Sequence, residues 1–388
     1  MTDISFLIGS GFSIKAGHPS TGFLNQRLGS LKENEIFIHT DMTAHFWERN
    51  GDKPSPRLQI QEELFIEKFI NFYCNSVIDG GDFDYERFFD YYHSQYRNNT
   101  YIESLSNFLE EFRNEYSYKK DNRNMLGHFN TFFNQLLKWL LYIKEYDEHT
   151  LAAYNRFKEL VYHLSSQNTL HFHTLNHDLL LENLGLYNGR IADGFDDLGS
   201  PYYGNLNDNY NIRLRRFTNK YDSSFRLYKL HGSIDMYNYH DKVNKQTDVI
   251  KTVNGIDLTN IFKEIGSGET LEYQHDFFDL IPKVLSGTTE KILTYDNFYF
   301  KDVINHLYAN LNSSQKLFII GYGFGDTKIN EILKNEFIDK GNRVVIISPS
   351  TPTNQFYHDI ISLENVKHKH FKIEDMDLDD VYNTMFND

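Results

Sequence analysis

The last third of the chain alternates short apolar runs with segments of helical length, and this alternation constrains the fold most strongly. The pattern predicts strands near 292–294, over 317–320 and over 343–348, separated by helices over 297–311 and 328–337. Strands that are joined through a helix run parallel, because the chain must cross back over the sheet before the next strand begins. We therefore expect an α/β fold, a doubly wound Rossmann-like parallel sheet.

The N-terminal segment resembles the opening of the same kind of domain. An apolar strand over 4–8 is followed by a turn rich in Gly and Ser, and a helix begins near Pro19 with Ser20 and Thr21 as candidate caps. This order predicts a strand, turn and helix unit.

The pattern between these two segments is helical. From about 58 to 167 the apolar residues recur at helical spacing, which suits four or five helices, and strand signals return over 170–174. We therefore predict one α/β domain with a large α-helical insertion. The domain comprises 1–31 and 168–388, and the insertion comprises 32–167.

A stretch rich in Tyr, Gly and Asn over 187–219 suggests hairpins, and a strand follows that ends at Leu230. The wider segment over 189–249 keeps many aromatic residues, which favours an ordered structure, with a flexible lid as the alternative.

Charge and cysteine content exclude several classes of protein. The 388 residues include 39 Lys and Arg against 54 Asp and Glu, a net charge of −15, which disfavours direct binding of nucleic acid. Cys74 is the only cysteine, so neither an intramolecular disulfide nor a zinc ribbon rich in cysteine can form. Because no targeting or membrane-spanning segment is evident, we expect a soluble, cytoplasmic protein that does not bind a membrane.

The first candidate site is the loop over 9–19, which follows the first predicted strand. Glycines there allow backbone N–H groups to approach a phosphate at the following helix. The third glycine, Gly17, lies eight residues after Gly9 rather than five, and Ile14-Lys15-Ala16 does not fit a P-loop. A tight structural turn and a ligand-binding loop therefore both remain open.

Polar residues follow two later strands. Asn176 and Asp178 come directly after the strand over 170–174, where a doubly wound sheet binds ligands, although either could merely cap the next helix. His231 follows the strand that ends at Leu230 and could be structural or could face a pocket.

A second glycine-rich segment follows the apolar strand over 317–320. Its glycines, Gly321, Gly323 and Gly325, leave backbone space for a nucleotide, although a plain turn would tolerate two of them. Ser348 ends the next strand.

Two histidine pairs are candidates for metal ligands. His171 with His173, and His368 with His370, have the spacing of residues on one face of a strand. No carboxylate or cysteine arrangement accompanies them, so we predict no metal site.

Taken in chain order, the motifs form a recognisable series. Gly-Ser-Gly-Phe-Ser, Ala-Gly-x-Pro, Thr-x-Asn-His-Asp, Leu-His-Gly-Ser, Thr-Tyr-Asp-Asn-Phe and Gly-Tyr-x-Phe-Gly-Asp resemble the sirtuin-like superfamily, and within it the sirtuin-like domains of bacterial antiphage defence. The resemblance covers 4–25 and 168–350, and the helical segment is matched only as a place of insertion.

Two departures favour one branch of that superfamily. Its protein deacylases carry a four-cysteine zinc module, and an Asp-Phe-Arg where this chain has Ser20-Thr21-Gly22-Phe23. The resemblance to the defence members implies an NAD glycohydrolase that releases nicotinamide and ADP-ribose and depletes NAD. The alternatives are a scaffold subunit that senses NAD or ADP-ribose without catalysis, and an NAD-dependent deacylase.

The resemblance also implies roles for individual residues. Asn176 and His231 match the catalytic asparagine and histidine, and Asp178 matches the acidic partner on the nicotinamide side. The other matched positions would contact NAD: Gly9, Ser10, Gly11, Phe12 and Ser13 at its phosphates and ribose, Gly321, Tyr322 and Gly323 in the second nucleotide loop, and Ser348 at the adenosine ribose.

Partners are implied in the same way. An enzyme that destroys NAD must be controlled, so we expect a homo-oligomer regulated by a partner protein. A HerA-type DNA-translocase ATPase or an Argonaute-like protein would fit, and such a partner would contact the nucleic acid.

Overall fold

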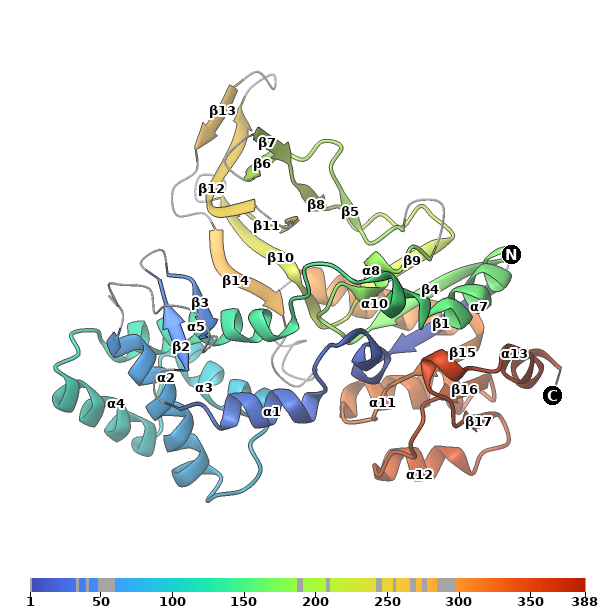
Figure 1. Cartoon of the computed structure of the whole chain (residues 1–388), viewed down its shortest axis with the longest axis horizontal. Helices are drawn as coiled ribbons and strands as arrows, with labels where there is room; N and C mark the ends of the chain where they lie inside the picture. The colour runs from blue at the N-terminus through green and yellow to red at the C-terminus, as the bar shows by residue number, and fades with distance from the viewer. Residues whose placement is uncertain are drawn as a thin grey trace.

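The computed structural model of the chain comprises a parallel sheet with helices on both faces, a helical region that includes a two-stranded antiparallel sheet, and two larger antiparallel sheets (Figure 1). The structure describes residues 2–32, 35–39, 42–47, 60–186, 191–206, 210–241, 246–253, 256–265, 270–273, 278–284 and 298–387.

The large sheet is parallel throughout and has the strand order β17-β16-β15-β1-β4-β9. The chain adds β4 and β9 on one side of β1, and then returns to the other side of β1 to add β15, β16 and β17. The order therefore reverses between β1 and β15, which confirms the doubly wound fold. The strands are β1 (Thr2–Ile8), β4 (Asn168–Thr174), β9 (Phe225–Lys229), β15 (Ser314–Ile320), β16 (Arg343–Ile347) and β17 (Val366–Lys369).

The two faces of this sheet bury alternate residues of each strand. On β1, Ile4, Phe6 and Ile8 pack in one core, whereas Leu7 packs in the core of the opposite face. The first face is covered by α7 (Asn155–Ser165), α8 (Leu180–Asn183) and α13 (Leu378–Phe386), and the second by α10 (Phe298–Ser313), α11 (Thr327–Leu333) and α12 (Gln355–Ile361).

Several predicted elements can be compared directly with the structure. Ser20 caps α1 (Thr21–Gly29) by accepting a hydrogen bond from the Phe23 amide, as predicted. The helix expected from Asp178 begins two residues later, at Leu180, as α8. The strand β17 was not predicted. The strand predicted near 292–294 lies outside the described residues.

The helical region has a core of its own, and α1 leads into it from the sheet (Figure 1). Phe69, Phe88 and Phe129 are fully buried there and contact one another through their rings. The next two helices, α6 (Glu148–Ala152) and α7, lead back to the sheet. The elements of the helical region that form this core are α1, β2 (Ile36–Ile38), β3 (Ala44–Phe46), α2 (Ile60–Phe72), α3 (Tyr85–Asn98), α4 (Glu103–Tyr116) and α5 (Asn122–Leu141). Ile234 and Val284, from strands later in the chain, also pack in it.

Two antiparallel sheets are formed by strands that lie between α8 and α10 in the chain, some before β9 and some after it. Hairpins were predicted only as far as residue 219, but the strands continue to Val284. The later strands were missed because polar residues interrupt their apolar pattern. One sheet contains β5 (Phe195–Asp196), β8 (Arg215–Phe217), β10 (Gly232–Asp241), β11 (Gln246–Lys251) and β14 (Phe278–Val284). The other contains β6 (Tyr202–Leu206), β7 (Tyr210–Arg213), β12 (Ile256–Ile265) and β13 (Thr270–Tyr273).

Candidate functional site

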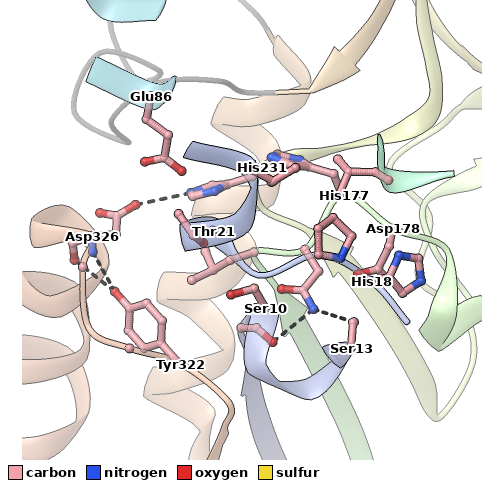
Figure 2. A pocket seen from close by; sticks show the side chains of 18 of the residues that line it. Ser10, Ser13, His18, Thr21, Glu86, His177, Asp178, His231, Tyr322 and Asp326 are labelled. Carbon is pink, nitrogen blue, oxygen red and sulfur yellow. Dashed lines mark hydrogen bonds and ion pairs between the residues drawn. The ribbon is translucent and has the colours of Figure 1, made fainter. Parts of the chain in front are cut away.

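A pocket of about 360 Å³ lies at the carboxyl ends of the central strands, where the loops after β1, β4, β9 and β15 meet (Figure 2). This is the crevice at which doubly wound sheets bind ligands, and its volume is within the usual range of small-molecule sites. The described residues that line it are Gly9, Ser10, Ser13, His18, Pro19, Thr21, Leu24, Asp84, Tyr85, Glu86, Leu141, Leu175, Asn176, His177, Asp178, His231, Tyr322, Gly323, Gly325 and Asp326.

The two glycine-rich loops pack against each other at the base of the pocket. The Gly9 amide donates to the Ile320 carbonyl at 3.0 Å, and the Gly11 amide donates to the Gly321 carbonyl at 2.9 Å. A Cβ atom at Gly9 would lie 2.7 Å from the Gly321 oxygen, and one at Gly321 would lie 2.3 Å from the Phe12 nitrogen. These glycines are therefore required for the packing of the loops, whatever they bind.

Gly323 and Gly325 differ from the glycines at the base of the pocket. Both line the pocket, and a Cβ atom at either would meet no described heavy atom within 4 Å. Packing does not require glycine here, so the absence of a side chain leaves space for a ligand.

Asn176 follows β4 and is 7% exposed, and its side chain is fixed by the loop after β1. Its amide nitrogen donates to the Gly9 carbonyl at 3.0 Å and lies 3.0 Å from Ser13 Oγ. Because a carbonyl oxygen can only accept a hydrogen bond, the Gly9 carbonyl must face the nitrogen of the Asn176 side-chain amide and not its oxygen. The other end, Oδ1, is buried and has no hydrogen-bond partner in the described structure. An orphaned acceptor in a pocket is typical of a ligand-binding group.

His231 follows β9 and contacts a carboxylate from the second glycine-rich segment. Its Nε2 atom lies 3.3 Å from Oδ2 of Asp326 (Figure 2). The other oxygen of Asp326, Oδ1, accepts hydrogen bonds from the amides of Lys328 and Ile329 and so caps α11. The cap fixes the carboxylate, and the carboxylate orients the imidazole.

The helical region contributes Asp84, Tyr85 and Glu86 to the same pocket. Figure 2 shows the Glu86 carboxylate pointing toward the pair formed by His231 and Asp326. Burial raises the pKa of Glu86 to about 7, even though the facing His231 acts to lower it.

Two further histidines line the pocket in their neutral form. Burial lowers the pKa of His177 to about 3, with further lowering from His231 and Lys229. Burial also lowers the pKa of His18, whose Nε2 lies 2.7 Å from the Tyr146 hydroxyl. Lys229 is buried below this region, where it forms an ion pair with Glu182 at 3.3 Å and donates to the carbonyl of Asp178.

The structure brings most of the predicted site residues together. The predicted positions that line the pocket are Gly9, Ser10, Ser13, Asn176, Asp178, His231, Tyr322 and Gly323. Asp178 was expected either to face a ligand or to cap the next helix, and the two roles are compatible. Its Oδ1 accepts a hydrogen bond from the Leu180 amide at 3.0 Å, and the residue also lines the pocket.

Four predicted positions do not line the described pocket. Gly11 and Gly321 form the contact between the two loops. The Phe12 ring is buried in the core against Tyr154 and Phe157. Ser348 follows β16, one strand further from the reversal of strand order, and its hydroxyl donates to the Ser350 carbonyl at 2.8 Å.

Other pocket residues were not predicted. Asp326 ends a motif that was recognised for its glycines, so the signal was present but unused. His18 lies in the first glycine-rich loop, where the predicted site residues were those at positions 9–13. Glu86 lies in the helical region, where nothing in the local sequence distinguishes it from a surface carboxylate.

The histidine pairs considered as metal ligands have protein partners. His173 Nε2 lies 3.3 Å from the side-chain amide of Asn310, and His368 contacts Tyr357 and Ser348. In the described ranges, no group of three or more His, Cys, Asp or Glu could hold a metal ion. Within the same ranges, no helix is long and apolar enough to cross a membrane.

Comparisons with known proteins match a segment of the chain that contains part of this site. A family model described as "SIR2-like domain" matches residues 170–369, more than half of the chain. No curated protein matches the chain. Among solved structures, the chain is similar to a Sir2 homologue in complex with NAD, with 10% identity and a TM-score of 0.39 over 98% of this chain and 88% of that chain. It is also similar to a mutant Sir2 homologue in complex with ADP-ribose, with 10% identity and a TM-score of 0.38 over 98% of this chain and 90% of that chain.

Proposed function

We propose that this chain, which belongs to the family of SIR2-like domains, cleaves the bond between nicotinamide and ribose in NAD. The products would be nicotinamide and ADP-ribose, with water as the nucleophile and one proton released. The observation that carries the proposal is the unpartnered Oδ1 atom of Asn176, which is held in a fixed orientation in the same pocket as His231.

The residues of the pocket fit a dinucleotide. Gly323 and Gly325 leave open space in the second glycine-rich segment, where a ligand can approach the backbone closely. No Lys or Arg is among the described lining residues, so phosphates would be bound by backbone amides and by hydroxyls such as that of Ser10. The carboxylates of the lining suit the positively charged nicotinamide ring.

The chemistry requires little from the protein beyond placement and charge. The nicotinamide ring of NAD carries a positive charge and leaves as a neutral molecule, so no acid must protonate it. The ribose becomes cationic as the bond breaks. An acceptor such as Asn176 Oδ1 can orient a water molecule at the anomeric carbon. The imidazole of His231 lies in the same pocket and can act as a general base that takes a proton from that water or from a ribose hydroxyl.

The direct test is release of nicotinamide from NAD by the purified protein, with and without the protein encoded beside it. Asn176→Ala and His231→Ala should each abolish release while circular dichroism shows that both variants remain folded. If the wild-type protein binds NAD and forms no product in any condition, the chain is instead a scaffold subunit that senses NAD. Acyl transfer from a peptide to ADP-ribose would indicate a deacylase.

We also propose a biological setting, on the resemblance of the motifs alone. The chain would act in antiphage defence as a homo-oligomer, controlled by a partner such as a HerA-type ATPase or an Argonaute-like protein. Light scattering and copurification with the neighbouring gene product test this setting. A monomer that is fully active alone would contradict it.

A further inference from the structure

The end of the pocket beside His231 is strongly acidic. Among its described lining residues, Asp84, Glu86 and Asp326 carry carboxylates at this end, and no Lys or Arg is present. Two of these carboxylates cap helices. Asp84 Oδ1 accepts from the amides of Glu86 and Arg87 and caps α3, and Asp326 caps α11. Glu86 caps neither helix.

The position of Glu86 is fixed by the helical region. The Tyr85 amide donates to Oδ1 of Asn25 on α1 at 3.0 Å, which holds the start of α3 beside α1. The Tyr85 hydroxyl donates to Oε1 of Glu86 at 3.2 Å, and within the described structure it alone hydrogen-bonds to this carboxylate. The carboxylate is directed into the pocket toward His231 and Asp326 (Figure 2).

A carboxylate at this position has a specific use if the pocket cleaves NAD. Hydroxyl groups of a ribose are donors, and a carboxylate is a strong acceptor for them. During cleavage the positive charge moves from the nicotinamide ring onto the ribose. A fixed negative group beside the ribose therefore stabilises the transition state more than the ground state.

We propose that Glu86 of the helical region is a substrate-contacting residue, whose carboxylate accepts a hydrogen bond from the ribose that carries nicotinamide and faces the positive charge that develops there. The proposal rests on the proposed function and extends it. In this arrangement the helical region supplies a wall of the same site that Asn176 and the first glycine-rich loop line.

Proton release on binding provides a readout that does not depend on turnover. In the free protein, burial raises the pKa of Glu86 to about 7. The groups facing it are Asp84 and Tyr85 at the start of α3, Tyr322 and Asp326 between β15 and α11, and His231 after β9. A cationic ligand favours the charged carboxylate and would displace its proton, so about half a proton should be released per site at pH 7.

The probe is carba-NAD, in which a methylene group replaces the oxygen of the ribose ring, so that the pyridinium cannot be cleaved. Calorimetry in buffers of different ionisation enthalpy measures the protons released. For the wild-type protein at pH 7 we expect carba-NAD to release about half a proton per site. ADP-ribose, which lacks the cation, should release less. In Glu86→Gln the proton released by the Glu86 carboxyl should be absent. Gln keeps the oxygen that accepts from Tyr85. Glu110→Gln, an exposed carboxylate of α4, is the matched control and should behave as wild type.

Hydrolysis of NAD is measured on the same variants. Glu86→Gln should lower kcat at least about tenfold and change KM less than about threefold, because the contact strengthens in the transition state. Glu86→Asp, which keeps the charge, should recover some of that loss. Unchanged proton release and unchanged kcat in Glu86→Gln, in an active wild-type background, would overturn the role of Glu86 and leave the proposed function standing. Failure of the wild-type protein to bind carba-NAD or to hydrolyse NAD would overturn both.

Discussion

The side-chain amide of Asn176 donates a 3.0 Å hydrogen bond to the backbone carbonyl of Gly9, which joins the ends of two neighbouring parallel strands. The two residues are 167 positions apart in the chain. The bond decides the chemistry of the pocket, because it directs the amide nitrogen toward the protein and leaves the oxygen as the acceptor.

The first prediction concerns this bond. Asn176→Asp places a carboxylate oxygen against the Gly9 carbonyl, so we expect it to lower the free energy of unfolding by about 1–3 kcal/mol and to abolish nicotinamide release. Urea denaturation and a nicotinamide assay measure the two effects. Asn183→Ala, an exposed asparagine after the same strand, should leave nicotinamide release unchanged. Full activity in Asn176→Asp would contradict the proposed role of the amide.

The second prediction separates the glycines needed for packing from those that leave space for a ligand. Gly9→Ala forces a Cβ atom to within 2.7 Å of backbone atoms of Gly321 and Tyr322, so we expect a loss of about 1–3 kcal/mol in stability. Gly323→Ala meets no described neighbour and should remain stable, while its methyl group weakens binding of ADP-ribose. Thermal unfolding and calorimetry check the pair. Equal binding by Gly323→Ala and wild type would argue against a ligand at this loop.

The third prediction concerns Asp326, whose two oxygens have different partners. Asp326→Asn can still cap α11 through its oxygen but loses the charge beside His231, so kcat should fall with little change in unfolding temperature. Asp326→Ala should lose about 1 kcal/mol of stability as well, because the cap is removed. Nicotinamide release and thermal unfolding, measured on both variants beside the wild-type protein, separate the charge from the cap. An unchanged kcat in Asp326→Asn would mean that Asp326 has only the capping role.

The fourth prediction concerns stability at mildly acidic pH. Burial lowers the pKa of His171 to about 4 and that of His177 to about 3, so between those values and about 6.5 the unfolded chain binds protons that the folded chain excludes. Each histidine should therefore reduce the free energy of unfolding by about 1.4 kcal/mol for each pH unit below 6.5.

Glu86 acts in the opposite direction. Its pKa is raised to about 7 in the folded chain, so it favours folding at acidic pH, and this contribution is lost as the pH rises through 7. Two histidines outweigh one glutamate, so we expect net loss of stability between about pH 6.5 and 5 in urea titrations. Glu86→Gln removes the opposing contribution and should make the loss steeper. A stability that rises as the pH falls over this range would contradict the prediction.

Much of the sheet could be predicted from the sequence, because its signals are local. Buried parallel strands such as β15 are continuous apolar runs, and the polar residues that follow them lie at one edge of the sheet. Asn176 and His231 were identified as candidates in this way. The antiparallel strands from β10 to β14 were not predicted, because polar residues interrupt their apolar pattern, which makes a local signal weak.

The sequence by itself determined most elements of the parallel sheet and the end of that sheet at which a site could form, since apolar periodicity within a segment favours one secondary structure there. Only the tertiary structure decided which groups meet there. Gly9 packs on Gly321, Asp326 orients His231, and Glu86 enters the pocket from a helix that precedes Asn176 by 90 positions. These contacts join segments far apart in the chain. They form only after the sheet and the helical region have each buried an apolar core, because that burial fixes the positions of the loops and helices that carry these residues.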